Sequence, residues 1–450
     1  MLGEKKFYLS LIIVILLAIL LRFFIMPFSF HGHDIFWINC FPHKFIEGEI
    51  KDPYLYIKEN SSKMEGASFA HGVGAYYPPG TFWIFVVFGY LFKPFLPKSN
   101  EICSVFTTFS SSSWSFPYPY TGNTIHFADA LINYQLYRTL FLFKVPYLIC
   151  DIVIGFALYQ LLKEDKKKAF IGLVIWAFNP FVLHSIYALG QLDIIVAMFI
   201  VLSLLAIKFK RPYLAVVSMS LGAGVKIIPF LLIPPIIIIL GKTIRKQIKL
   251  LLTSLAVFLA PFIPFFLNSK SAVFHIFYKA SDFEISPLRG VIFISAYLLF
   301  LTILYFFKVK RDSDDLKILT FSFISVLLLF YLYDVTLRFF VLVTPLLIML
   351  AVRDKIFWIY NVIFFITLFE LRACANTQQW GLFAALHPEF FSSLPIADSF
   401  LNLLVNVKYI HQYMYRLFVL SCAIMVAHIF MLNRNLFRFH LPIRAKDEKR

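Results

Sequence analysis

Apolar runs of about 15–20 residues recur along most of the chain, and they constrain its fold more than any other feature. Hydrophobic residues make up 60% of the 450 residues, whereas charged residues make up only 15%. A soluble domain of this size does not have that composition, so the runs are interpreted as membrane-spanning helices. The sequence therefore predicts an all-α, polytopic membrane protein with about 12 transmembrane helices. The predicted spans are 7–28, 141–162, 169–187, 193–209, 212–225, 227–241, 248–267, 289–307, 317–334, 338–352, 356–371 and 414–433.

Lysine and arginine set the predicted orientation of these spans. The net charge is +17, and basic runs such as KEDKKK (163–168) and KVKRDSDDLK (308–317) follow even-numbered spans. Cytoplasmic loops of membrane proteins collect such residues, so both termini are expected in the cytoplasm of a cell-membrane protein. This bias accounts for the charge without nucleic acid, because no basic stripe interleaved with aromatic residues appears outside the loops.

The predicted organisation is one integral membrane domain over 1–450. Its main polar part is an extracytoplasmic loop region with interfacial helices, 29–140. The apolar stretch PPGTFWIFVVFGYLF (78–92) could itself cross the membrane. A span there would reverse the orientation of all later spans. The stretch is short and begins with two prolines, so an interfacial or re-entrant helix is preferred. Further outer loops are predicted at 268–288 and 373–413, and a basic cytoplasmic tail at 434–450.

Five cysteines are scattered along the chain without a CxxC pair or the spacing of a zinc site. Cys150 and Cys422 fall within predicted spans. Cys40, Cys103 and Cys374 would face outside, so one disulfide could form among them.

Asp34 is the first candidate for chemistry, because it lies just beyond the first apolar span in the stretch FHGHDIFWINCF. A carboxylate at that level can deprotonate an acceptor hydroxyl while a lipid-borne substrate stays in the membrane. The alternative is an aspartate that caps a short helix. His31 and His33 flank it and are weak candidates for binding a divalent metal, since imidazole and carboxylate both bind such cations. No cofactor is otherwise expected.

Cations at the outer parts or ends of the spans form a second group of candidates. A charge there is costly unless it reaches the interface or finds a partner, and a lipid phosphate is such a partner. Asp151 follows one of these lysines by seven residues, on the same helix face, and could pair with a buried base. The candidate phosphate ligands are Arg22, Lys144, Lys226 and Arg338.

Several motifs in this order resemble the GT-C superfamily of integral membrane glycosyltransferases. They are an aspartate after the first span, YYPPG (76–80), NPFVLHSIYALGQLD (179–193) and LGAGVKIIP (221–229). The resemblance covers roughly residues 7–241, and more loosely 333–350. It is nearest to the first mannosyltransferase of GPI-anchor synthesis and to bacterial polyprenol-phosphate-mannose-dependent mannosyltransferases.

The resemblance implies an inverting transfer of a hexose, with mannose favoured, from a polyprenyl-phosphate donor on the extracytoplasmic face. The acceptor would be a glycolipid, a glycan or a protein. Asp34 would be the general base. Related eukaryotic enzymes carry Asp-x-Asp there, whereas this chain has Gly32 at the first position, which leaves a role for metal open. The alternative for Asp193 is a structural role, as the N-cap of the helix that it opens. Residues that would border the sugar or the acceptor are His33, His71, Tyr76, Tyr77, Gln191 and Asp193.

Two other classes of protein remain open at this stage. A transporter or flippase of lipid-linked sugars would share the spans and the cations, but it would not need a base in the first loop. An envelope-assembly protein could bind lipid without any chemistry. No nucleotide-binding motif occurs, so a sugar donor should arrive attached to lipid.

Overall fold

The computed structural model describes residues 2–30, 32–60, 77–96, 103, 135–268, 287–306, 315–333, 337–369, 383, 386, 390, 394, 402 and 406–432. Regular structure within these residues is helical, and no strand occurs among them. The predicted all-α class is therefore confirmed.

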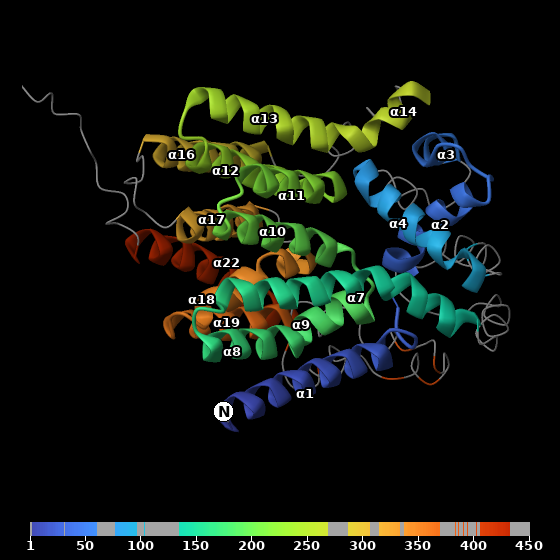
Figure 1. Ribbon diagram of the computed structural model, residues 1–450, viewed down its shortest axis with the longest axis horizontal. Helices are drawn as coiled ribbons and strands as arrows, with labels where there is room; N and C mark the ends of the chain where they lie inside the picture. The colour runs from blue at the N-terminus through green and yellow to red at the C-terminus, as the bar shows by residue number, and fades with distance from the viewer. Residues whose placement is uncertain are drawn as a thin grey trace, which may run out of the picture.

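Most of the helices lie side by side in one bundle, with their axes close to a common direction (Figure 1). Each of the twelve predicted spans corresponds to helical structure. The unbroken bundle helices are α1 (Leu2–Ile25), α7 (Gln135–Leu162), α10 (Asp193–Lys208), α11 (Pro212–Val225), α16 (Pro287–Phe306), α17 (Asp315–Tyr333), α19 (Ile356–Phe369) and α22 (Val407–Leu432).

Four predicted spans are broken into pieces of different helix type. Each contains at least one proline, which lacks the N–H that continues an α-helix. The pieces are α8 (Lys166–Ala177), α9 (Pro180–Val182) and the π-helix η2 (Leu183–Ala188); η3 (Ile228–Leu232) and α12 (Ile233–Leu240); α13 (Ile244–Leu259), η4 (Ala260–Phe262) and α14 (Ile263–Asn268); and η5 (Leu337–Leu342) and α18 (Thr344–Ala351).

Five helical segments in the described part are long and apolar enough to cross a membrane, and four shorter apolar helices accompany them. These segments support a membrane protein, while the number of crossings and their direction stay predictions. The five are Lys5–Ile25, Leu136–Leu162, Lys166–Ala188, Ile244–Phe266 and Val407–Met431.

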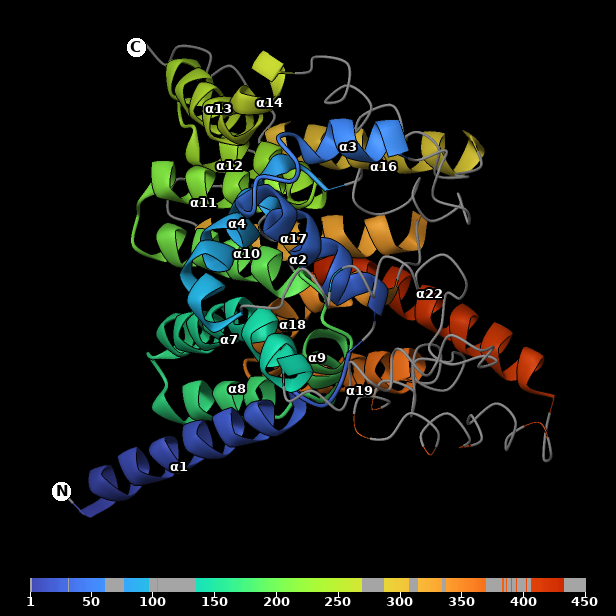
Figure 2. The ribbon, with the colours of Figure 1, turned by 90° about the vertical axis from the view of Figure 1, so that its right-hand side faces the viewer.

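The centre of the bundle is α10, which packs between α7 and α11. Ile194, Val196 and Ile200 of this helix are fully buried. By contrast, α1 runs along the edge of the bundle (Figures 1 and 2), and only 11% of its apolar window is buried. The core therefore surrounds the helix whose first residue is Asp193.

Three short helices gather at one end of the bundle, where they face the viewer in Figure 2. They are α2 (Gly32–Ile46), α3 (Pro53–Asn60) and α4 (Pro79–Phe92), and α4 continues into η1 (Lys93–Phe95). We call this part of the molecule the α2–α4 end. Here α4 packs against α2 and against α11. Its interpretation as an interfacial or re-entrant helix stays a prediction.

A disulfide joins Cys40 of α2 to Cys103. Sequence reasoning left this pair open, with Cys374 as a third candidate. Cys150 and Cys422 are free and buried in α7 and α22, as their predicted places in spans require.

Several predicted boundaries differ from the structure; α7, for example, begins at Gln135, inside the predicted loop 29–140, and the last span differs most. Helix α22 begins at Val407, before the predicted start of the last span at 414, so the end of the loop assigned to 373–413 is part of that helix. The tail at 434–450, and most of the loops at 268–288 and 373–413, lie outside the described residues.

Candidate active site

The segment between α9 and α10 has an unusual backbone. Asn179 caps α9, since its Oδ1 accepts from the amides of Phe181 (3.0 Å) and Val182 (3.1 Å). The π-helix η2 follows, in which the Leu189 amide donates to the His184 carbonyl five residues back (2.9 Å). π-Helical turns occur frequently at functional sites.

Gly190 ends this turn with a φ of +87°, a conformation that favours glycine. A Cβ at this position would lie 2.9 Å from Cδ1 and 3.2 Å from Cβ of Ile35. Ile35 is fully buried in the first turn of α2, next to Asp34. The start of α2 therefore rests directly on the turn that carries Gly190.

Asp193 and Lys226 form a buried ion pair at the same place. Lys226 Nζ donates to Asp193 Oδ1 at 2.7 Å, and the two residues are only 7% and 2% exposed. The N-cap residue of α10 is Leu192, without a side-chain cap hydrogen bond. The interpretation of Asp193 as a helix cap was therefore wrong: it lies in the first turn and uses its carboxylate on Lys226.

The first turn of α4 closes onto the end of α11, beside this ion pair. Thr81 Oγ1 donates to the Val225 carbonyl at 2.7 Å. Gly80 approaches the backbone of Gly224 so closely that a Cβ would lie 2.4 Å from its carbonyl oxygen. The ring centroid of Tyr77 lies 6.0 Å from Lys226 Nζ. The YYPPG motif thus places an aromatic ring at the Asp193–Lys226 pair.

Gln191 lies between Gly190 and this pair and is 2% exposed. Both polar atoms of its carboxamide are buried and have no hydrogen-bonding partner among the described residues. An unsatisfied buried polar group costs roughly 1–3 kcal/mol. Such a group in a native protein is expected to meet a ligand or a bound water.

The structure therefore brings Tyr77, Gln191, Asp193, Lys226 and the start of α2 together; we call this cluster the α2 junction. For Asp34 and His33 the structure describes the backbone, in the first turn of α2, but not the side chain. Arg338 lies in η5 with its side chain likewise not described. His31, His71 and Tyr76 lie outside the described residues.

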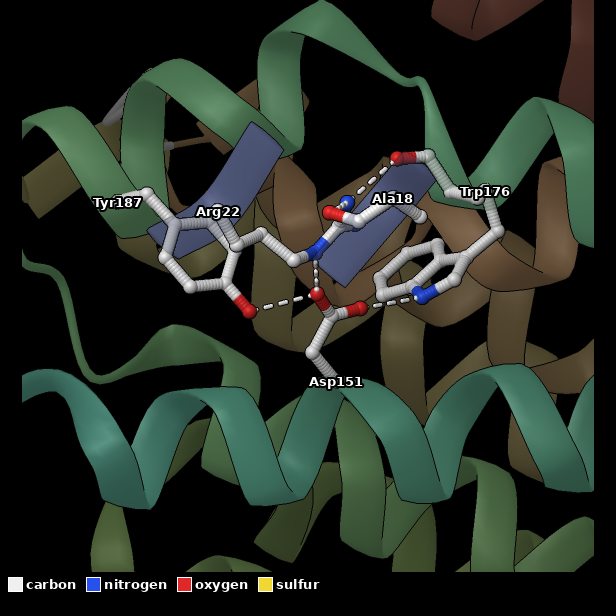
Figure 3. A network of polar contacts seen from close by, with 6 residues as sticks. Ala18, Arg22, Asp151, Trp176 and Tyr187 are labelled. Carbon is white, nitrogen blue, oxygen red and sulfur yellow. Dashed lines mark hydrogen bonds and ion pairs between the residues drawn. The ribbon is translucent and has the colours of Figure 1, made fainter. Parts of the chain in front are cut away.

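Two of the predicted phosphate ligands lie elsewhere. Arg22 of α1 pairs with Asp151 of α7, with both residues 3% exposed (Figure 3). The same carboxylate accepts from Trp176 Nε1 and from the Tyr187 hydroxyl, each at 2.6 Å. Arg22 Nη1 donates to the carbonyls of Ala18 (3.0 Å) and Ala177 (2.7 Å). The expectation that Asp151 pairs with a buried base is thereby met, across α1 and α7.

Lys144 is completely buried, and its shortest contacts are with backbone carbonyls, besides a longer one with Ser29 Oγ at 3.4 Å. Its Nζ donates to the carbonyl oxygens of Met26 (3.0 Å), Ser29 and Tyr187 (2.6 Å). Sequence reasoning missed the roles of Ser29, Trp176 and Tyr187. Buried tyrosine and tryptophan usually find a partner for their polar atom, and that rule was the available signal.

His43 lies on the buried side of α2, with its ring 5.4 Å from that of Phe143. Burial lowers the pKa of His43 from 6.5 to about 4, so the ring is neutral near pH 7. Among the described residues no group of three or more His, Cys, Asp and Glu could hold a metal ion. The side chains of His31 and His33, the metal candidates, lie outside that set.

Comparison with known proteins adds one finding. The sequence model of glycosyltransferase family 87, a membrane family of the GT-C type, matches residues 125–304. The match covers less than half of the chain, from before α7 to α16, and includes Gln191, Asp193 and Lys226. It supports a membrane glycosyltransferase of the GT-C superfamily. No curated protein and no solved structure matches the chain.

Proposed function

We propose that this protein is an inverting glycosyltransferase that moves a hexose, mannose in the first instance, from a polyprenyl-phosphate donor to a glycolipid, glycan or protein acceptor. The observation that carries the proposal is the contact between Ile35 and Gly190. It sets the first turn of α2, with Asp34, against the turn that leads to the Asp193–Lys226 pair. The second of these segments lies within the match to glycosyltransferase family 87.

The reaction needs a base on one side of the sugar and positive charge on the other. Asp34 takes the proton of the acceptor hydroxyl as that oxygen bonds to the anomeric carbon. The bond from the anomeric carbon to the phosphate oxygen breaks on the opposite face, and the lipid phosphate leaves with the negative charge. Lys226 and Arg338 are the cations that we assign to this phosphate, because preorganised positive charge stabilises a leaving anion.

The neighbouring residues suit recognition of a sugar. Gln191 offers a donor and an acceptor in a buried position, the combination that hydroxyl groups require. Tyr77 presents a ring beside Lys226. Asp193 belongs to the same junction through its ion pair with Lys226, and His33, His71 and Tyr76 remain candidates for the acceptor side.

The disulfide supports an extracytoplasmic site. Disulfides persist in oxidising compartments and are rare in the cytosol. Cys40 lies in the same helix as Asp34, so its bond to Cys103 favours placing the α2–α4 end outside. Both termini would then lie in the cytoplasm, as the charge bias predicts.

A transfer assay on the purified protein tests the proposal. Radiolabelled polyprenyl-phosphate mannose is supplied with a membrane glycolipid extract, with and without EDTA, to the wild type and to Asp34→Asn. We expect transfer by the wild type and none by Asp34→Asn, because an amide cannot accept the proton. If EDTA stops transfer, His31 and His33 become the first residues to test as metal ligands.

Asp52→Asn is the matched control. Asp52 lies in the same loop region and caps α3, where its Oδ1 accepts from the amides of Tyr54 (2.9 Å) and Leu55 (3.1 Å). Asparagine caps helices about as well as aspartate, so this variant should transfer normally. Normal transfer by Asp34→Asn as well would remove the assigned base, and the absence of transfer from any lipid-phosphate sugar would favour a transporter.

A further inference from the structure

We propose that Lys144 and Asp151 are positioning residues, which hold the two segments of the α2 junction in register through Tyr187. The inference rests on the proposed function, and it replaces phosphate binding as the role of Lys144 and of Arg22. Four elements take part: α1 and the residues that follow it, α7, the end of α8, and η2. Figure 3 shows the part of this network around Asp151.

The hydrogen-bonding capacity of Lys144 argues against a phosphate. An ammonium group has three N–H donors. Three carbonyl oxygens, those of Met26, Ser29 and Tyr187, accept from Nζ. The residue is also completely buried. A lipid phosphate could bind Lys144 only after some of these bonds had broken.

Tyr187 is held through its side chain and through its backbone. Its hydroxyl donates to Asp151 Oδ2 at 2.6 Å. Its carbonyl oxygen accepts from Lys144 Nζ at 2.6 Å. Lys144 and Asp151 both belong to α7, so this helix fixes the π-helix η2 through the backbone and through the side chain.

The same lysine also fixes the exit of α1. The Ser29 carbonyl accepts from Lys144, and Ser29 precedes Asp34 by five residues. Its hydroxyl lies within hydrogen-bonding distance of the carbonyls of Ile25 (2.8 Å) and Tyr187 (3.1 Å). Tyr187 precedes Gln191 by four residues. The network therefore lies immediately before both segments that meet at the contact between Ile35 and Gly190.

A fixed geometry explains this arrangement better than added stability. Replacement of a buried ion pair by apolar residues is often neutral or favourable for stability, so such a pair is weak evidence of a stabilising role. Displacement of a reacting group by 1 Å can lower the rate about 100-fold. The expected effect of losing the network is thus on turnover.

The first test is Lys144→Met, which keeps the apolar stem and removes the donors. We expect kcat to fall about 100-fold while the KM for polyprenyl-phosphate mannose changes by less than about twofold. Tyr187→Phe, which removes only the hydroxyl bond to Asp151, should show the same split with a smaller fall in kcat. A rise in KM with little change in kcat would assign Lys144 to the donor phosphate and overturn the inference.

Two control variants remove comparable bonds away from the junction. Lys208 Nζ donates to the carbonyls of Gln160 (3.0 Å) and Leu161 (3.1 Å) at the other end of α7 and also pairs with the exposed Glu164 (2.9 Å), so Lys208→Met removes a comparable set of bonds. Tyr297 donates to the Leu231 carbonyl at 2.7 Å, so Tyr297→Phe matches Tyr187→Phe. Both controls should keep kcat. An equal fall of kcat in the controls would show that the network only stabilises the fold, and would overturn the inference.

Hydrogen exchange followed by mass spectrometry tests the positioning role of Lys144 independently of activity. In Lys144→Met we expect faster exchange in peptides covering 26–35 and 185–195, with peptides from α11 and α13 unchanged. No change in the first two peptides would overturn the inference even if transfer is lost. A wild type without transfer, combined with the expected exchange pattern, would refute the proposed function and leave the network's positioning role intact.

Discussion

Replacing Gly190 with alanine should displace the start of α2. The φ of +87° costs a residue with a Cβ about 1–2 kcal/mol. The new methyl group would also lie 2.9 Å and 3.2 Å from two carbon atoms of Ile35. Overpacking of this kind costs about 1–3 kcal/mol, so the expected total loss of stability is about 2–5 kcal/mol.

Gly48 provides the control that separates the two costs. Its φ is +79°, and a Cβ there would meet nothing within 4 Å. Gly48→Ala should therefore show only the backbone cost, about 1–2 kcal/mol. The thermal midpoint in detergent should fall in the order wild type, Gly48→Ala, Gly190→Ala, and only Gly190→Ala should lose transfer activity.

Ile35→Val tests whether the clash is the cause. It removes Cδ1, the nearer of the two atoms, and by itself costs about 0.5–1.5 kcal/mol. In the Gly190→Ala background it should cost less or restore some stability, because it makes room for the new methyl group. Equal midpoints for Gly48→Ala and Gly190→Ala, with transfer intact in both, would refute the contact on which the α2 junction is built.

Three further outcomes follow from the structure. His43 has a pKa lowered by burial to about 4 against 6.5 unfolded, so its stabilising contribution is complete above pH 6.5 and disappears as the pH falls to 4. The stability that the wild type loses between pH 7 and pH 4 should be smaller in His43→Leu by up to about 3 kcal/mol, which is checked by comparing the thermal midpoints of both proteins at the two pH values. Asp193→Asn or Lys226→Met alone should cost about 3–5 kcal/mol, whereas the double variant should fold better than either and still fail to transfer; additive losses would contradict the ion pair. Cys40→Ser should lose about 4 kcal/mol through the loop of 63 residues, and a reducing agent should lower the midpoint of the wild type but not of this variant.

The sequence predicted what depends on local pattern. Apolar runs located the helices, and the motif NPFVLHSIYALGQLD placed Gln191 and Asp193 at the start of α10. The YYPPG motif likewise predicted a helix with proline in its first turn, which is α4. In these cases a few neighbouring residues determine the backbone, so no knowledge of packing was needed.

Pairing between distant helices could not be predicted in the same way. Arg22 and Asp151 are separated by 129 positions, and each is adjacent to apolar residues that say nothing about its partner. The sequence predicted Lys226 as a phosphate ligand for the same reason as Arg22 and Lys144. Only the packing of the helices shows that Arg22 and Lys144 have their protein partners away from the α2 junction, whereas Lys226 pairs with Asp193 within it.

The π-helix has a consequence for which changes in chain length the protein tolerates. A π-turn spans one residue more than an α-turn, so deletion of a single residue within 183–188 would let the ordinary α-helical bonding pattern form. Because the wider turn accommodates one extra residue, the chain after the deletion would keep nearly the same direction around the helix axis, and only the π-turn would be lost. The turn that ends at Gly190, on which Ile35 rests, would nevertheless lose its present backbone geometry, although every side chain needed for chemistry would still be present. Variation among natural relatives of this chain should therefore include substitutions in this hexapeptide but no insertions or deletions.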